Sequence, residues 1–455
     1  MRTVPLGKIM LEPIKKPDTE NKRGRPSSIL FLKKKVTGTD MTAYLDGLVF
    51  HPLWKKRTFV WIFCVLCSAV FIVSIIPHSA DIDIDSPSYY TAAKGIQKGI
   101  NIYEEERFQS LADQTFGHSK IVWPFIYPPL TAQIFIPLTL LNPLDYSRAL
   151  LLINILATFL CVFLLADLLK LGSHPSGLPL LFLFSMLLFN FPLYRTLEFG
   201  QLNMWVLACL LLSLRLDRQN RPLSSAFFLM AAIFLKIFPA VFLVYYLIKK
   251  RFRYVTTALV SGLGLLGLSV ILSGLNPWID YVKILFRSFV LGEKPLYFFD
   301  FTTFLNNNSL KAFFTQFLMH FDLSRSFASI LVLLFLVTVA IAARKKIADF
   351  FRIQDQNFIA SILIMLPLVL SSMCWPHHFV SLMIPAVYIF ALIIEKRRYS
   401  LLVPFLAVYG LFAYFPPYGG FPFNHARLLA AILIFPLIHI AYEEKPHLIN
   451  TKNDY

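Results

Sequence analysis

Three aspartates stand at alternate positions, Asp81, Asp83 and Asp85, just after the first long apolar segment of the chain. Carboxylates close to hydrocarbon cost free energy, so in membrane proteins they usually mark a functional site. Three carboxylates this close together repel one another, which raises the proton affinity of at least one and suits it to act as a general base. The alternative is structural, because Asp85 precedes Ser86-Pro87 and could cap the helix that follows.

A lysine and a pair of histidines offer the complementary chemistry. Lys236 lies among apolar residues, where its ammonium could bind a phosphate or its long stem could reach the membrane surface. His377 and His378 follow Trp375-Pro376 and could bind a phosphate or donate a proton to a leaving oxygen, or they could belong to an aromatic belt at the membrane interface. No metal site is expected, because adjacent histidines lack the i, i+4 spacing of ligands on one helix face.

Other polar side chains lie where apolar segments are predicted to end on the same side of the membrane. They are Tyr127, Arg195, Glu198, Gln201, Lys236 and the run from Asn306 to Ser309. A base could take the proton of an acceptor hydroxyl, while cations stabilise a departing lipid phosphate. The residue types therefore favour transfer of a group from a phosphate-bearing lipid carrier.

Apolar helices must position these residues. The chain has 455 residues, 57% of them hydrophobic, and a mean hydropathy of +0.63, which excludes a soluble globular protein. The apolar runs are too long and too uniform for the alternating strands of an outer-membrane barrel. We therefore predict an all-α polytopic membrane protein with about 11–12 transmembrane or re-entrant helices, one of them a single span at about 178–195.

The basic residues predict the orientation of these helices. Lys55, Lys56 and Arg57 precede the first apolar segment, so the positive-inside rule places the N-terminus in the cytoplasm. The basic loops at 249–253 and 396–398 fix the later segments in the same way and place the polar site on the extracytoplasmic face. Much of the formal net charge of +17 lies in these loops and the N-terminal segment, so it indicates topology and contact with anionic lipids, and nucleic-acid binding is not expected.

Five regions follow from this pattern. They are a basic, disordered cytoplasmic tail at 1–57, a membrane domain at 58–443, a first external loop at 78–126 with an amphipathic helix at 88–100, a second large external loop at 276–325, and a cytoplasmic C-terminal tail at 444–455. Residues 127–141 are rich in proline and are expected to be re-entrant. Residues 223–247 are expected to form two half-helices broken at Lys236 and Pro239, which gathers the intramembrane polar residues on one side.

Six short motifs occur in a fixed order along the chain. They are Asp85-Ser86-Pro87-Ser88-Tyr89-Tyr90-Thr91-Ala92-Ala93, Tyr127-Pro128-Pro129, Gly200-Gln201-Leu202-Asn203, Lys236 with Pro239, Asn308-Ser309-Leu310, and Trp375-Pro376-His377-His378. In order and spacing they resemble the GT-C class of integral membrane glycosyltransferases. The resemblance is greatest to polyprenyl-phosphate-mannose-dependent α-(1→2) mannosyltransferases, which include bacterial phosphatidylinositol mannosyltransferases. One departure is Asn307-Asn308-Ser309, where that family has Asn-Gln-Ser.

The resemblance implies an inverting transfer of a hexose, with mannose as first choice, from a polyprenyl-phosphate sugar donor to a hydroxyl of a lipid or glycan acceptor. Asp85 would be the general base, with Asp83 as second choice. The other implied roles are donor-phosphate or acceptor contact for His377 or His378, phosphate binding for Lys236 and Arg195, and substrate binding for Tyr89, Tyr127, Gln201 and Asn308.

No cofactor and no metal is implied. The expected setting is a bacterial plasma membrane, or alternatively the endoplasmic reticulum, with the donor, the acceptor and membrane lipids as partners. The alternative function is a transporter or flippase of a lipid-linked saccharide, in which Lys236 would bind the same phosphate.

Overall fold

The computed structural model describes residues 38–77, 85–117, 122–289, 303–304, 306–413 and 420–443. Within these ranges all regular secondary structure is helical. The chain divides into two compact units, Met1–Tyr44 and Leu45–Tyr455. Helix α1 spans Gly38–Val49, and the architecture described below belongs to the second unit.

Six helical segments among the described residues are long and apolar enough to cross a membrane. They are α2 (Arg57–Ile75), α6 (Pro143–Leu168), α12 (Phe252–Ser273), and the segments Arg325–Ala342, Pro376–Glu395 and Phe423–Tyr442, which contain α15 (Ala328–Ala342), α18 (Met383–Glu395) and α20 (Ala426–Tyr442). Shorter apolar helices pack among them: α7 (Leu178–Ser185), α17 (Gln356–Leu370) and α19 (Leu402–Ala413). This arrangement confirms the predicted all-α polytopic membrane fold.

Two of the membrane segments are broken. Helices α8 (Phe191–Glu198) and α9 (Asn203–Arg218) meet at a bend of 115°. Helices α10 (Pro222–Leu235) and α11 (Ala240–Ile248) are separated at Lys236, whose backbone is extended. The predicted break at Lys236 and Pro239 is confirmed, whereas the uninterrupted segment expected at 178–195 consists of two short helices, α7 and α8.

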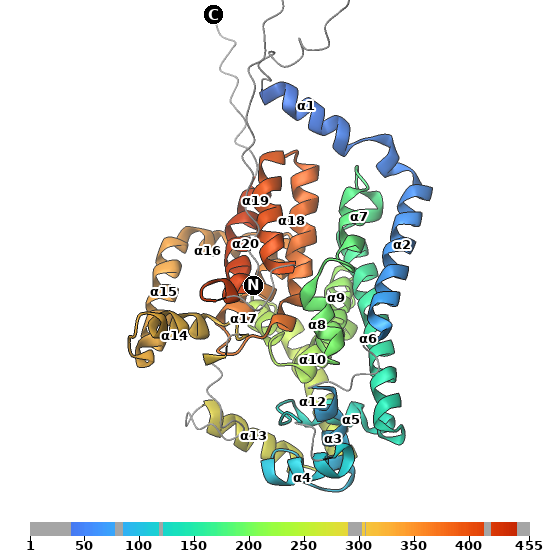
Figure 1. Ribbon diagram of the computed structural model, residues 1–455, viewed down its shortest axis with the longest axis vertical. Coiled ribbons are helices and arrows are strands. Elements are labelled where there is room, and N and C mark those ends of the chain that lie inside the picture. The colour runs from blue at the N-terminus through green and yellow to red at the C-terminus, as the bar shows by residue number, and fades with distance from the viewer. Residues whose placement is uncertain are drawn as a thin grey trace, which may run out of the picture. The chain divides into compact units, whose positions relative to one another are not determined.

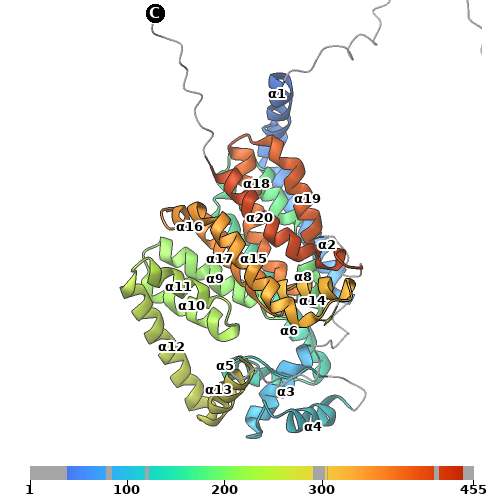
Figure 2. The ribbon, with the colours of Figure 1, turned by 90° about the vertical axis from the view of Figure 1, so that its left-hand side faces the viewer.

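A smaller group of helices, which includes α3, packs around the first turns of α3. This group comprises α3 (Ser86–Gln97), α4 (Glu105–Phe116), α5 (Pro129–Ile134) with the 3-10 turn Ile136–Leu140, and α13 (Asn276–Phe289), which both ribbon views show together at the end opposite α18 and α19 (Figures 1 and 2). Aromatic rings fill its core, including Tyr89, Phe125 and Phe135. The stretch 129–140 is far too short to cross a hydrocarbon layer of about 30 Å as a helix.

Helix α3 occupies most of the predicted amphipathic segment but is enclosed more completely than an amphipathic surface helix. Nine of its residues are buried, including eight consecutive positions from Ser86 to Ala93. Contacts with α4, α5 and the turn after α5 cover faces that a lone surface helix would leave in lipid or water. The segment that carries the candidate base is therefore held rigidly by its neighbours.

The larger helical group contains the main apolar core and the surface that faces lipid. Helices α14 (Leu310–His320) and α16 (Arg344–Phe350) flank α15, while Figure 1 shows α18, α19 and α20 side by side. Large apolar side chains are exposed on α2, α12 and α15; Ile271 of α12, for example, is 82% exposed. In a membrane protein such a surface is solvated by lipid chains, so these three helices form part of the lipid-facing boundary.

Candidate active site

The site forms where the first broken segment meets the start of α3. Gly200, in the bend between α8 and α9, has a φ of +64°, a conformation that glycine adopts without steric cost. A Cβ at Gly200 would lie 2.8 Å from the Cβ of Ser86 and 3.1 Å from Leu150. The bend therefore packs directly against the residue after Asp85, which explains why glycine stands between the two half-helices.

Lys236 lies buried in the second break and is held by two amide oxygens. Its Nζ donates to Oε1 of Gln201 at 2.9 Å and to Oδ1 of Asn203 at 2.7 Å. Its ammonium also lies 5.4 Å from the ring centroid of Tyr127. Only 9% of the residue is exposed, so the snorkelling alternative is wrong: the ammonium points into the protein.

Two tyrosines line the other side of Gln201. The hydroxyls of Tyr89 and Tyr127 each lie 3.4 Å from Oε1 of Gln201, in hydrogen-bond geometry but at long range. Their ring centroids are 5.2 Å apart. Burial, with a further contribution from the charge of Asp85, raises the pKa of both tyrosines well above the usual value, so both remain neutral hydroxyl donors near pH 7.

Asp85 lies at the beginning of α3, within electrostatic reach of this cluster. It occupies the N-cap position, but its side chain makes no capping hydrogen bond, which argues against the capping alternative. Its charge acts on Tyr89, Tyr127 and the Lys236 ammonium. A carboxylate and a buried ammonium therefore occupy the same small region. Asp81 and Asp83 lie outside the described residues.

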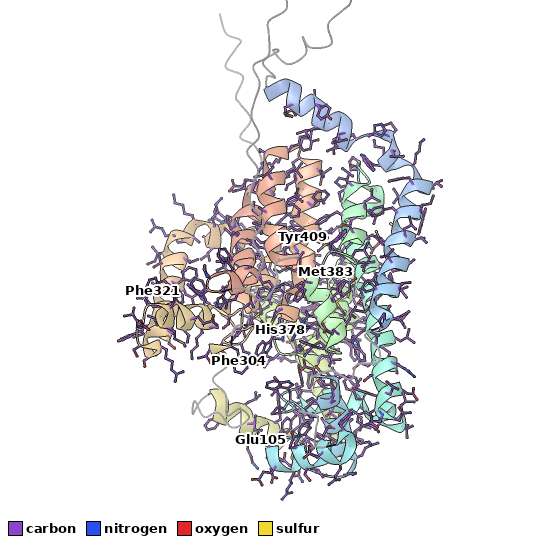
Figure 3. All side chains as sticks on the ribbon, in the orientation of Figure 1. Glu105, Phe304, Phe321, His378, Met383 and Tyr409 are labelled. Atoms are coloured by element: carbon purple, nitrogen blue, oxygen red, sulfur yellow. The ribbon has the colours of Figure 1, made fainter. Side chains whose placement is uncertain are left out.

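The histidine pair lies beside the same break. The backbone carbonyl of His377 accepts from Nδ2 of Asn203 at 3.0 Å and from Oγ1 of Thr196 at 3.2 Å. The His377 side chain is buried, and neither ring nitrogen has a hydrogen-bond partner among the described residues. Nδ1 of His378 accepts from the backbone N–H of Trp375 at 3.3 Å, which places the proton of a neutral imidazole on Nε2. Figure 3 shows His378 above the α3–α5 group, at the height of α8.

Two of the predicted residues lie at the margin of the cluster. Arg195 forms an ion pair with Glu198 at 2.7 Å, and its guanidinium stacks 4.0 Å from the ring centroid of Phe199. Asn308 is fully buried; its backbone N–H donates to the carbonyl of Cys374 at 2.7 Å and its side-chain amide donates to Asn306. Asn308 thus supports the segment before the histidines, and among the described residues neither Arg195 nor Asn308 is hydrogen-bonded to Lys236.

The structure adds two residues that the sequence motifs did not single out as site residues, Asn203 and Thr196. Asn203 stood in the Gly-Gln-x-Asn motif, and its polarity directly after a helix break was the available signal. Nothing in the sequence around Thr196 indicated a place in the site, because its partner His377 lies 181 positions away along the chain. Among the described residues, no group of three His, Cys, Asp or Glu side chains is arranged to hold a metal ion.

The fold and the cluster define a membrane protein with a buried polar site that carries a carboxylate and an ammonium held by amide oxygens. The model of glycosyltransferase family 87 matches residues 125–376, more than half of the chain. The chain belongs to this family and is a membrane glycosyltransferase. A search of curated proteins and a search of solved structures gave no significant match. The matched range includes Tyr127, Gln201 and Lys236, starts after Asp85, and ends one residue before His377.

Proposed function

We propose that this membrane glycosyltransferase transfers a hexose, with mannose as first choice, from a polyprenyl-phosphate sugar to a hydroxyl of a lipid or glycan acceptor. Asp85 accepts the proton of the acceptor hydroxyl, with Asp83 as second choice for this role. The acceptor oxygen forms a bond to the anomeric carbon while the bond from that carbon to the phosphate oxygen breaks. The polyprenyl phosphate leaves with the electron pair, and the configuration at the anomeric carbon is inverted.

The observation that carries this proposal is a carboxylate and a buried ammonium in one region of the protein. The Asp85 carboxylate lies within electrostatic reach of Lys236, whose ammonium is bonded to neutral amide oxygens. A buried cation without a bonded carboxylate can stabilise the charge that develops on a leaving phosphate. The unbonded ring nitrogens of His377 provide a further donor or acceptor for the phosphate or for the acceptor substrate.

The position of the basic residues supports a site on the extracytoplasmic face. Asn203 begins α9 at the site, whereas Arg215 and Arg218 lie in the last turn of the same helix. Arg251, at the start of α12, is bonded to Asp217 near that second end. By the positive-inside rule the arginine-rich end faces the cytoplasm, so the site faces outward. A plasma membrane is the proposed location.

Transfer by the purified protein tests this function. In nanodiscs, wild-type protein is expected to move labelled mannose from polyprenyl-phosphate mannose to a lipid or glycan acceptor. Asp85→Asn should lower kcat by about 10²- to 10⁴-fold, since it removes the general base and keeps the side-chain shape. Asp145→Asn is the matched control, because Asp145 is exposed in the first turn of α6.

Two outcomes would contradict parts of the proposal. Undiminished transfer by Asp85→Asn would exclude Asp85 as the base and transfer that role to Asp83. Absence of transfer with every polyprenyl-phosphate sugar, together with movement of a lipid-linked saccharide across liposomes, would replace the enzyme with a transporter.

A further inference from the structure

Asn203 uses both ends of its side-chain amide to join two parts of the site. Its Oδ1 accepts from Nζ of Lys236 at 2.7 Å, and its Nδ2 donates to the carbonyl of His377 at 3.0 Å and lies 3.3 Å from Oγ1 of Thr196. The residue is the first of α9 and is buried. One side chain therefore connects the α10–α11 break with the segment that carries the histidines.

The side chains that hold Lys236 are neutral, so its positive charge remains available to attract an anion. An ammonium has three protons, and the protein bonds two of them, to Gln201 and Asn203. Both acceptors are neutral amides, and no ion pair to Lys236 occurs within the described part of the chain. An aspartate at position 203 would have nearly the same shape but would neutralise the cation. A neutral acceptor here thus fixes the ammonium in place and preserves its attraction for an anion.

We propose that Asn203 is a positioning residue for the transfer reaction, which holds the Lys236 ammonium at a fixed place relative to His377. The assignment of roles to Lys236 and His377 rests on the proposed function, whereas the connection itself rests on the hydrogen bonds. Without Asn203, the long lysine side chain loses one of its two anchors, and the His377 carbonyl keeps only its bond from Thr196. Preorganised charge is the main way in which a site stabilises a transition state, so this anchoring should appear in the rate.

Thr196 supplies a matched control. Its hydroxyl donates to the same His377 carbonyl at 3.2 Å and accepts from Nδ2 of Asn203 at 3.3 Å, but within the described residues it has no hydrogen bond with Lys236. Thr196→Val therefore removes one bond to the His377 carbonyl and one contact of the Asn203 amide group, but it leaves the bond between Asn203 and Lys236 in place. Asn203→Ala removes that support together with the lysine anchor, and Asn203→Asp keeps the shape while adding a charge that pairs with Lys236.

The first test needs no substrate. Thermal melting midpoints are measured in nanodiscs for Asn203→Ala, Lys236→Met and the double variant, and for Thr196→Val with Lys236→Met. The first pair should be non-additive, because each single change already breaks the shared bond, whereas the second pair should be additive. Additive shifts in both pairs would overturn the proposal. If Lys236→Met does not fold, Lys236→Gln replaces it in both pairs.

The second test measures the reaction. Asn203→Asp and Asn203→Ala should each lower kcat/KM for the polyprenyl-phosphate donor by about tenfold or more, and Thr196→Val by less than about threefold. Combining Asn203→Ala with Lys236→Met should lower kcat/KM little further than Lys236→Met alone, because no ammonium is left for Asn203 to hold. Unchanged kcat/KM in both Asn203 variants would overturn the positioning role. If wild-type protein transfers no sugar, the proposed function fails, and the melting cycle still decides whether Asn203 anchors Lys236.

Discussion

Helix α9 has a polar network at each end, and the two networks treat charge differently. At its last turn, the Asp217 carboxylate accepts from both terminal nitrogens of Arg251, at 2.7 and 2.9 Å, so the buried negative charge is matched by a cation. At its first residue, about 21 Å away along the helix, Lys236 is bonded only to amide oxygens. The first arrangement is an ion pair of the kind that stabilises a fold. The second leaves a positive charge that can attract an anionic ligand.

An open pocket of about 790 Å³ lies at the arginine-rich end, lined by Asp217, Arg218 and Arg251 among others. In it Asp217 and Arg251 are paired with each other, while the Arg218 guanidinium donates to the side-chain oxygens of Gln356 and Asn357 and to the Leu168 carbonyl. We therefore expect the buried Lys236 ammonium, rather than this open pocket, to mark the reaction site.

Removing one cation from each end should give opposite results, and this is the largest difference expected between the two ends of α9. Lys236→Met should lower kcat/KM for transfer by about 10²-fold, because it removes the cation that stabilises the leaving phosphate. Arg251→Met should leave transfer per folded molecule unchanged and lower the free energy of unfolding by about 1 to 3 kcal/mol, since it leaves Asp217 unpaired in a partly exposed ion pair. Transfer assays and melting curves on both variants measure the difference, and equal losses of transfer would abolish the distinction between the ends.

A methyl group at the bend beside the site tests how tightly that end is packed. Gly200→Ala should destabilise the protein by about 1 to 3 kcal/mol, because the residue has a positive φ and its Cβ would press against Ser86. It should also slow transfer, since Ser86 adjoins Asp85. Gly264→Ala is the control: it lies within α12 with nothing within 4 Å, and alanine there should be neutral or stabilising by up to about 1 kcal/mol. Similar melting midpoints for the two variants would contradict the close approach.

The smallest effect is expected at Tyr127. Its contact with Gln201 is long, at 3.4 Å, so Tyr127→Phe should lower transfer by only about two- to fivefold. The pH dependence of stability gives a second measurement. Burial raises the pKa of the Tyr127 hydroxyl, so above about pH 10 the unfolded chain releases this proton before the folded protein does, and stability falls as pH rises.

As the pH rises above about 10, Tyr127→Phe should therefore lose less stability than the wild-type protein does. Below about pH 10 the stability of the two proteins should depend on pH in the same way. Melting midpoints across the alkaline range provide the check. A steeper alkaline loss in the variant would show that the hydroxyl ionises more readily in the folded protein than in the unfolded chain.

Hydropathy and local breaking signals were sufficient for the fold class and for one important detail of the membrane segments. Apolar runs predict spanning helices because each helix satisfies its own backbone hydrogen bonds. Lys236 and Pro239 predicted the break between α10 and α11 because a charged residue and a missing N–H both act locally. The expectation for 178–195 was wrong because hydropathy outweighed a local signal: Asn190 caps the start of α8, and Pro192 stands in its first turn.

The sequence by itself thus determined a helical membrane protein and most of the residues that form its polar site, since residue type, spacing and hydropathy are local properties. Only the tertiary structure decided which of them meet. Lys236 contacts Asn203 across 33 positions, and Asn203 reaches the His377 carbonyl across 174. Arg195 and Asn308 were predicted on equal terms with Lys236, yet they bond to Glu198 and Asn306. Such pairings depend on how distant helix breaks pack against one another, and no local pattern encodes that geometry.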